Sequence, residues 1–321
     1  MAHEIDLSTG KPAIAYVGEK PWHGLGEKLP EGAPIENWLE AARLQWELNR
    51  LPVQYLVNGA YLTMEDRFVL VRDDTRAALS IVSDEYQIVQ PKEVLEFYRD
   101  LMTDYGYTLE TAGALDGGRK VWALARTGIV SSAGKDDELA AYVLLATSCD
   151  KTLATTAAFT SIRVVCQNTL VFAMEDISRQ RRRQVKVPHN LHFDAGQVKD
   201  DLGLMDKAWS EFIAKVRKMA RYPMKLESAS YFFEDLLVQK KGNPLSNRAK
   251  NEHETIRALY GSAPGQDLGT AKETLWGAVS AVTYYVDHVR GSAGDRLDSA
   301  WFGAGYLLKE KAWAKANVLV S

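Results

Sequence analysis

The sequence lacks any apolar run long enough to cross a membrane. A spanning helix needs about 20 consecutive, mostly apolar residues, and no stretch of the 321 residues approaches that length. The first residues, MAHEIDLSTG, also lack the basic and then apolar order of a secretory signal peptide. The only two cysteines, Cys149 and Cys166, do not suggest the disulfide framework of an oxidising compartment. We therefore expect a cytoplasmic protein.

The motifs of several enzyme classes are also missing. There is no phosphate-binding loop of the GxxxxGK[ST] type, and Gly24-Leu25-Gly26 lacks the third glycine of a dinucleotide fingerprint. His189 and His192 lie three residues apart, but no CxxC or HExxH accompanies them. Cys166 follows an apolar strand pattern, which favours a small buried hydrophobe over a nucleophile. We therefore predict no enzymatic activity, no cofactor and no metal site. The alternative is an unrecognised metal-dependent nuclease built from scattered carboxylates.

What the sequence does contain is a β-rich first half and a helix-rich second half. Residues 1–50 are expected to form an arm rich in Gly and Pro, followed by a helix. Residues 51–170 read as an antiparallel sheet with one helix, because strand-like runs are separated by hairpin signals such as Asn58-Gly59 and Asp116-Gly117-Gly118. The helix is expected to begin at Pro91 and to end at Gly106. Residues 171–321 are expected to be helical, with a basic first part. This order predicts the α+β class, an antiparallel β-meander packed by a helix and followed by a helix-rich C-terminal half.

Six helices are predicted after the last strand. The first runs through Leu170–Arg183, and Asn168 or Thr169 could cap it. The others cover residues 198–221, 228–240, 245–260, 271–289 and 298–316. The fifth carries an apolar stripe from Leu275 to Val289, which indicates a core face or an oligomer contact.

Charge is unevenly distributed along the chain. Residues 1–150 hold 14 Lys and Arg against 24 Asp and Glu, a net charge of −10. Residues 151–260 hold 19 against 12, a net charge of +7, and residues 261–321 hold 6 of each sign. The basic segment therefore indicates a polyanion site on one face. Ordinary solvated lysines and arginines are the alternative.

Two basic clusters lie within that segment. On a helix, Arg179, Arg182 and Arg183 would share a face, where like charges repel by about a few tenths of a kcal/mol per pair. A bound anion would offset that repulsion, and guanidinium groups suit phosphate because they present a planar fork of donors. We predict that both clusters bind nucleic acid, with a solvated helix face as the alternative. Their members are Arg179, Arg181, Arg182, Arg183 and Lys186 in the first, and Lys215, Arg217, Lys218, Arg221 and Lys225 in the second.

Arg163 is a third kind of basic residue, because it stands alone in an apolar strand. In a strand it faces away from Ile162 and Val164, toward either a groove or an internal ion pair. Polar Gln167 and Asn168 follow it and extend a polar strip. We therefore favour the groove and include Arg163 among the nucleic-acid-binding residues.

Three segments carry a resemblance to a known family. PWHGLGEKL, AAFTSIRVVCQNTL, and TLWGAVSAVTYYVDH followed by GAGYLLKEKA resemble the phage- and plasmid-encoded family called domain of unknown function 932. This resemblance implies a mobile-element setting. More distantly, an antiparallel sheet followed by basic helices resembles phage single-strand annealing proteins of the RecT/Redβ/Erf kind. Those proteins form rings or filaments and pair complementary DNA strands without ATP.

We therefore expect an oligomeric protein that binds and anneals single-stranded DNA in recombination or replication of a mobile element. Its partners would be DNA, further copies of itself, and host or phage replication and recombination proteins. The oligomer contact is expected at the arm that carries Trp22 or at the late apolar helices. The alternative is an anti-defence or host-protein-binding module that uses the acidic first half.

Overall fold

The computed structural model describes residues 4–18, 21, 24–163, 165, 168–171, 184–202, 205–238, 244–292 and 296–321. The chain divides into two units, each assembled from three segments. Unit 1 comprises Met1–Gly128, Tyr142–Ala158 and Gln184–Gly203, and unit 2 comprises Ile129–Ala141, Phe159–Arg183 and Leu204–Ser321. The units do not coincide with the three consecutive parts expected from the sequence. Three long strands contribute residues to both units: β7 (Lys120–Gly134), β8 (Asp137–Ser148) and β9 (Thr155–Arg163).

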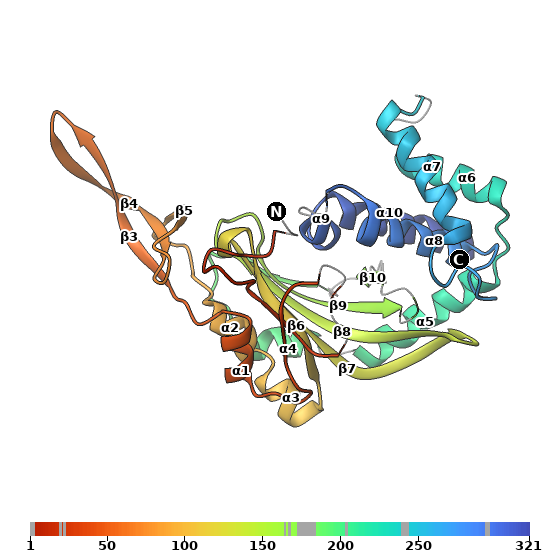
Figure 1. Ribbon diagram of the computed structural model, residues 1–321, viewed down its shortest axis with the longest axis horizontal. Helices are drawn as coiled ribbons and strands as arrows, with labels where there is room; N and C mark the ends of the chain where they lie inside the picture. Colours follow the sequence, from red (N-terminus) through yellow and green to blue (C-terminus); the bar gives the residue numbers. More distant parts are fainter. Residues whose placement is uncertain are drawn as a thin grey trace. The chain divides into compact units, whose positions relative to one another are not determined.

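The larger sheet has the strand order β10-β9-β8-β7-β6-β1-β2, with β11 also paired to β9. Its central strands β6 to β9 can be followed in Figure 1. Strands β6 to β9 are neighbours both in the chain and in the sheet, and β6 and β7 run antiparallel around the Asp116–Gly118 turn. The predicted antiparallel meander is therefore confirmed. At the far edge, β1 is antiparallel to β6 but parallel to β2. The remaining strands are β1 (Ile14–Tyr16), β2 (Glu27–Lys28), β6 (Thr108–Leu115), β10 (Asn168–Val171) and β11 (Gln184–Val187).

Strand β10 corrects one prediction. Residues 168–171 pair antiparallel with β9, Thr169 opposite Ile162 and Val171 opposite Thr160. The predicted helix therefore does not begin at Leu170, and Asn168 and Thr169 are strand residues instead of helix caps. The edge of β9 supplies backbone partners from outside the segment, and such pairing overrides local propensity. The rest of that predicted helix, residues 172–183, lies outside the described residues.

Short helices pack on the sheet in unit 1. They are α1 (Ile35–Ala41), α2 (Pro91–Glu96), α3 (Arg99–Tyr105) and α4 (Ala195–Leu202). The single helix expected between Pro91 and Gly106 is thus divided into two, and Gly106 ends the second with φ 68° as predicted. Tyr98 lies at the division and is fully buried. Its hydroxyl donates to the carbonyl oxygens of Ala123 at 2.7 Å and Val143 at 3.1 Å, which ties the helices to β7 and β8.

A second sheet in unit 1 has only three strands, in the antiparallel order β3-β4-β5. The bounds are β3 (Leu48–Val57), β4 (Ala60–Arg72) and β5 (Ala78–Ser83). Asn58 and Gly59 both have positive φ, 49° and 82°, as a two-residue hairpin turn requires. Because β5 pairs only with residues 67–71 of β4, the outer half of the β3–β4 hairpin is a two-stranded ribbon. Its tip lies apart from α1, α2 and α3 of the same unit (Figure 1).

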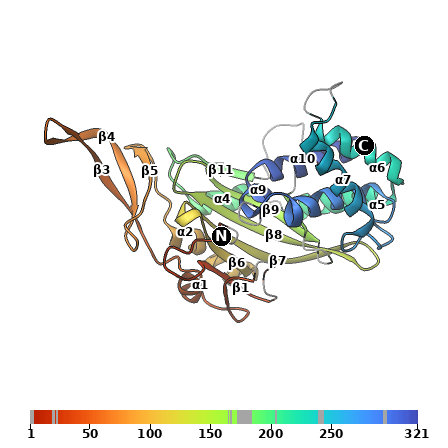
Figure 2. The ribbon, with the colours of Figure 1, turned by 45° about the horizontal axis from the view of Figure 1, so that its top comes forward.

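Unit 2 is built mainly from helices (Figure 2). Helix α8 is its centre, because every side chain from Leu275 to Thr283 is buried, and α5, α7 and α10 pack on it. The apolar stripe that begins at Leu275 is therefore a core face. The helices are α5 (Met205–Arg221), α6 (Leu226–Leu237), α7 (Asn247–Ser262), α8 (Leu275–Tyr284), α9 (Arg296–Trp301) and α10 (Ala304–Val320), and a π-helical turn follows α8 at Tyr285–Val289. Among the described helices, none is long and apolar enough to cross a membrane.

Candidate nucleic-acid interface

Helix α5 carries most of the second basic cluster, and its sequence explains how it presents the cations. Its apolar residues recur at helical spacing and are buried, namely Trp209, Phe212, Ile213, Val216 and Met219. The Trp209 indole also donates to the Ser131 hydroxyl at 2.8 Å, which anchors the helix to the end of β7. With that face fixed, the basic residues must occupy the other face.

The cations of α5 differ in their local partners. Arg217 donates through Nε and Nη2 to the carbonyl oxygen of Ser132, at 3.0 and 2.9 Å. Lys218 makes a long contact of 3.4 Å from Nζ to the carbonyl oxygen of Val320. Arg217, Lys218 and Arg221 are exposed, and Lys215 is half-buried. Within the described residues, no carboxylate forms an ion pair with any of these four cations.

Three of these cations, Lys215, Lys218 and Arg221, form a stripe on α5. Their spacing of three residues places them on neighbouring turns, over about 9 Å of helix axis. That length corresponds to about three nucleotide steps of a stacked strand. Lys218 and Arg221 lie in the last turn, where the helix dipole favours positive charge by about 0.3–1 kcal/mol. The dipole therefore accounts for part of the cluster, but not for Lys215. We call Lys215, Lys218 and Arg221 the α5 stripe.

The rest of the predicted binding residues are only partly brought together. Lys225 is exposed at the N-terminal cap of α6, close after α5 in unit 2. Lys186 is exposed on β11, which belongs to unit 1. Arg179, Arg181, Arg182 and Arg183 lie outside the described residues.

Arg163 does not face a groove, which corrects the favoured interpretation. Its side chain is 1% exposed and pairs with Asp137, whose side chain is 0% exposed. The guanidinium donates from Nε to Asp137 Oδ1 at 2.6 Å and from Nη2 to Oδ2 at 2.9 Å. The internal ion pair, which was the alternative, is therefore confirmed. Arg163 is removed from the candidate nucleic-acid-binding residues.

The surroundings of Asp137 show why this charge is tolerated inside the protein. Asp137 Oδ2 also accepts hydrogen bonds from the Thr270 hydroxyl at 2.6 Å and the Trp276 indole at 3.0 Å. Arg163 Nη2 donates further to the carbonyl oxygen of Gly265 at 3.1 Å. A buried ion pair is stable only when such additional hydrogen bonds satisfy its remaining polar groups. The pair therefore joins the start of β8 and the end of β9 to α8 and to the loop before it.

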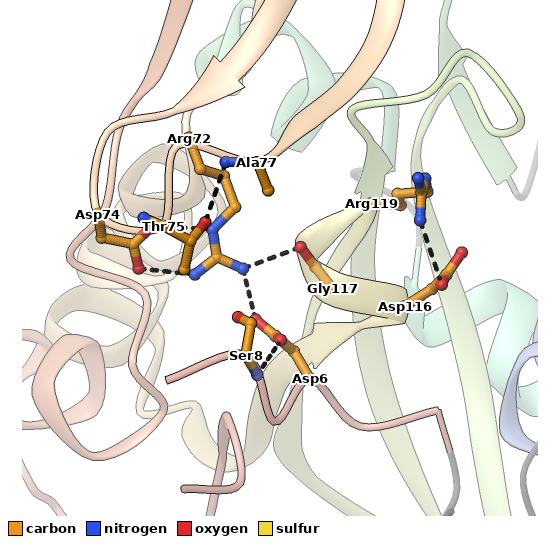
Figure 3. Close-up of polar contacts among 9 residues, drawn as sticks. All are labelled: Asp6, Ser8, Arg72, Asp74, Thr75, Ala77, Asp116, Gly117 and Arg119. Atoms are coloured by element: carbon orange, nitrogen blue, oxygen red, sulfur yellow. Dashed lines mark hydrogen bonds and ion pairs between the residues drawn. The ribbon is translucent and has the colours of Figure 1, made fainter. Parts of the chain in front are cut away.

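A comparable buried pair holds unit 1 together (Figure 3). Arg72 donates to Asp6 at 2.5 Å, to both oxygens of Asp74 at 2.9 and 2.7 Å, and to the carbonyl oxygen of Gly117 at 2.9 Å. Its guanidinium also lies over the Trp46 ring at 4.2 Å. Burial alone would raise the pKa of Asp74, but the hydrogen bonds and the charge of Arg72, together with hydrogen bonds from Thr75, outweigh it and hold that pKa below its ordinary value. Arg72 thus fixes the N-terminal segment and the β6–β7 turn to the base of β4.

A hollow of about 430 Å³ in unit 2 is a poor site for phosphate. Two of its lining residues, Asp136 and Glu138, are acidic and would repel an anion. Its lining consists of Ser132, Gly134, Lys135, Asp136, Glu138 and Val165.

Two of the groups that could serve enzymatic chemistry, Cys149 and His189, lie in surroundings that favour a structural role. Cys149 is buried, and burial raises the pKa of its thiol to about 12, so the reactive thiolate is disfavoured. The His189 ring stacks on Tyr86 at 4.6 Å, and its Nε2 lies 3.0 Å from the carbonyl oxygen of Leu153. No three His, Cys, Asp or Glu side chains gather as a metal site among the residues described. Cys166 lies outside them.

Among the comparisons with known proteins, only the one with family models finds a match. No curated protein and no solved structure matches the chain, so the distant resemblance to RecT/Redβ/Erf proteins stays a prediction. The family model of domain of unknown function 932 (DUF932) matches residues 78–301. That span covers more than half of the chain and includes the Asp137–Arg163 pair and the whole of α5, α8 and α9. The chain therefore belongs to the family described as domain of unknown function 932.

Proposed function

We propose that the chain is a non-enzymatic, self-associating DNA-binding protein of a mobile element, and that it binds single strands through the α5 stripe. The observation that supports this function is a contrast in how cations are used. Arg72, Arg163 and Lys309 are buried and each is paired with a carboxylate. Lys215, Lys218 and Arg221 lie on a helix face without such a partner among the described residues. Cations on a protein surface that are not neutralised locally can bind a polyanion.

The proposed mechanism is electrostatic. Phosphates of one strand would contact the α5 stripe and Lys225, and each contact would release a condensed counterion. Contacts to phosphate position a strand without reading its sequence, so the bases stay available to pair with a complementary strand. We also propose that the arginine run from Arg179 to Arg183, which lies outside the described residues, binds phosphate. No ATP is needed for such annealing, which agrees with the absence of a phosphate-binding loop from the sequence.

A fluorescence-polarisation titration tests this function. A labelled 30-nucleotide single strand and the matching duplex are titrated at 50 mM and 200 mM NaCl, with EDTA and then with Mg²⁺. We expect single-strand binding that weakens steeply with salt and leaves the oligonucleotide intact. Absence of binding at 50 mM NaCl would contradict the proposal and favour the protein-binding alternative. Cleavage of the strand with Mg²⁺ would favour the nuclease alternative.

A further inference from the structure

The tip of the β3–β4 hairpin is apolar and carries no charge. No Asp, Glu, Lys, Arg or His occurs from Leu51 to Met64. Large side chains are exposed on both faces of the ribbon, because Leu56 opposite Tyr61 and Tyr55 opposite Leu62 lie on alternate faces. Their exposures are 61% and 73% for the first pair and 46% and 45% for the second. A contiguous exposed apolar surface of this kind marks an interaction site.

The outer edge of β3 is protected at its base and open at its tip. Leu48 donates its backbone N–H to Gln90 Oε1 at 2.8 Å, and its carbonyl oxygen accepts from Gln90 Nε2 at 3.1 Å. The backbone groups of Leu48 therefore face away from β4, and Pro52 lies in the same uninterrupted ladder and shares that direction. Beyond the register shift, Val57 and Ala60 flank the two-residue turn as a hydrogen-bonded pair, so Gln54 and Leu56 also face away from β4. Pro52 has no N–H to offer. Gln54 and Leu56 present both an N–H and a carbonyl oxygen on the outer edge of their sheet.

The opposite edge of the ribbon is less suited to pairing. Beyond β5, strand β4 carries Glu65 and Asp66, and residues 64–67 interrupt the register between the Gln54–Thr63 and Pro52–Phe68 pairs. Charged residues and bulges are the usual means by which proteins protect strand edges from association. The tip of β3 has no charge and no extra residue from Leu51 to Val57, whereas β4 is free of both only over the shorter stretch from Ala60 to Thr63. The tip of β3 is therefore the edge of this sheet that can best pair with a further strand.

We infer that a second copy of this chain pairs with the tip of β3 in antiparallel orientation, about a two-fold axis at Tyr55. A nucleic acid would find no cation in this stretch, and a bilayer would leave the edge N–H and carbonyl groups without partners. A protein strand satisfies both the apolar side chains and the backbone groups. Antiparallel pairing of a strand with its own copy is self-complementary, as a two-fold contact requires. This inference deepens the self-association in the proposed function, and it differs from the contacts expected at the Trp22 arm or the late helices.

The register follows from the direction of the backbone groups. With Tyr55 on the axis, Gln54 faces Leu56 of the second copy in a hydrogen-bonded pair, and Leu56 faces its Gln54. The two Tyr55 side chains then form a cross-strand aromatic pair, flanked by Val53 opposite Val57 on both sides. Such cross-strand pairs of aromatic and β-branched residues stabilise antiparallel sheets. The product is a six-stranded antiparallel sheet, β5-β4-β3-β3-β4-β5, shared by two copies.

Cross-linking of the full-length chain without DNA tests this register. Tyr55→Cys, in a background with Cys166→Ser, places two thiols across the proposed axis, where Cβ atoms of facing residues are about 4.5–5.5 Å apart. We expect a disulfide-linked dimer on mild oxidation. The control is Thr63→Cys, which is also exposed on the same hairpin but lies on β4, and it should stay uncross-linked. Equal cross-linking of both variants, or none at Tyr55→Cys, overturns the β3 contact.

Light scattering and sedimentation of a second pair of variants give an independent measurement. Gln54→Pro removes one outward N–H at a position where an edge strand tolerates proline, and should weaken association about tenfold or more. Tyr61→Ser removes apolar surface from β4 without changing the β3 edge, and should weaken it less. If circular dichroism shows that Gln54→Pro is unfolded, the cysteine pair alone decides. A monomeric wild-type chain overturns self-association altogether, whereas a wild-type oligomer insensitive to Gln54→Pro overturns only the β3 contact.

Discussion

Arg163 and Lys218 belong to the same unit and the same basic segment, yet the structure uses them in opposite ways. Arg163 is 1% exposed and makes two short hydrogen bonds to the equally buried Asp137. Lys218 is exposed, and its Nζ lies 3.4 Å from the backbone carbonyl oxygen of Val320. The positive charge of Arg163 is neutralised inside the protein, so it contributes little to an external field. The comparison teaches that the number of cations in a segment overstates the charge available to a ligand.

The first prediction concerns the buried ion pair between Arg163 and Asp137. Arg163→Ala leaves the Asp137 carboxylate buried without its cation, and should lower the free energy of unfolding by about 3–5 kcal/mol. Urea denaturation measures the change, and DNA affinity per folded molecule should be retained. The double variant Arg163→Ala/Asp137→Ala is the control, and it should recover part of the loss because no charge is then stranded. A stable Arg163→Ala protein with weakened DNA binding would restore the groove interpretation.

The second prediction concerns the pH dependence of stability that comes from Asp74, the partly exposed partner of Arg72. Burial opposes ionisation of Asp74, but the hydrogen bonds and the charge of Arg72, together with hydrogen bonds from Thr75, outweigh it and lower the pKa of this carboxyl. A depressed carboxyl pKa stabilises the fold above the pKa of the unfolded chain, about 3.9, and this stabilisation is lost as pH falls through the folded value. Asp74→Asn should therefore cost about 1 kcal/mol at pH 7, a modest amount because Asp74 is 30% exposed. The difference from wild type should shrink below about pH 4.

Asp66→Asn is the matched control for that experiment. Asp66 pairs with Arg67 at 2.7 Å, but its side chain is 65% exposed. Exposed pairs contribute little to stability, so this variant should unfold like wild type at every pH. A pH dependence equal in Asp66→Asn and Asp74→Asn would show that the Arg72 cluster has no special effect.

Local signals in the sequence were sufficient to predict where the turns lie, but not which charged residues pair inside the protein. Asn58-Gly59, Asp116-Gly117-Gly118 and Gly106 each require a backbone conformation that few residues adopt, so their positions could be predicted. Strand β10 was missed because its partner, β9, lies outside the local pattern. Asp137 was missed because an aspartate between Asp136 and Glu138 resembles a solvated turn.

One signal could have located Asp137. It begins β8 and Arg163 ends β9, and these strands are neighbours in the sheet. An antiparallel alignment about the intervening turn would have placed an acid and a base near the same end of the hairpin. The contacts from Thr270 and Trp276 come from a segment more than 100 residues later, and no local pattern indicates them. The protected and open parts of the β3 edge likewise depend on Gln90, which is distant in the sequence.

The third prediction concerns the α5 stripe, for which we expect the smallest change in stability. Lys215→Gln/Lys218→Gln/Arg221→Gln should alter the free energy of unfolding by less than about 1 kcal/mol, because exposed charges contribute little and only the last turn gains from the helix dipole. The control is Lys11→Gln/Lys28→Gln/Lys92→Gln, which removes three exposed cations from unit 1. Thermal unfolding of both triple variants should resemble that of wild type. Early melting of the α5 variant alone would show that its cations are structural partners.

The most direct test of the proposed interface is the salt dependence of single-strand binding by these same two variants. Each phosphate contact to a single strand contributes about 0.7 to the slope of log K against log salt concentration. The α5 variant should therefore bind more weakly than wild type at 50 mM NaCl, with a slope reduced by about 2. The unit 1 variant has the same net charge and should keep the wild-type slope. Equal losses in the two variants would contradict a site on α5 and reduce its cations to ordinary surface charge.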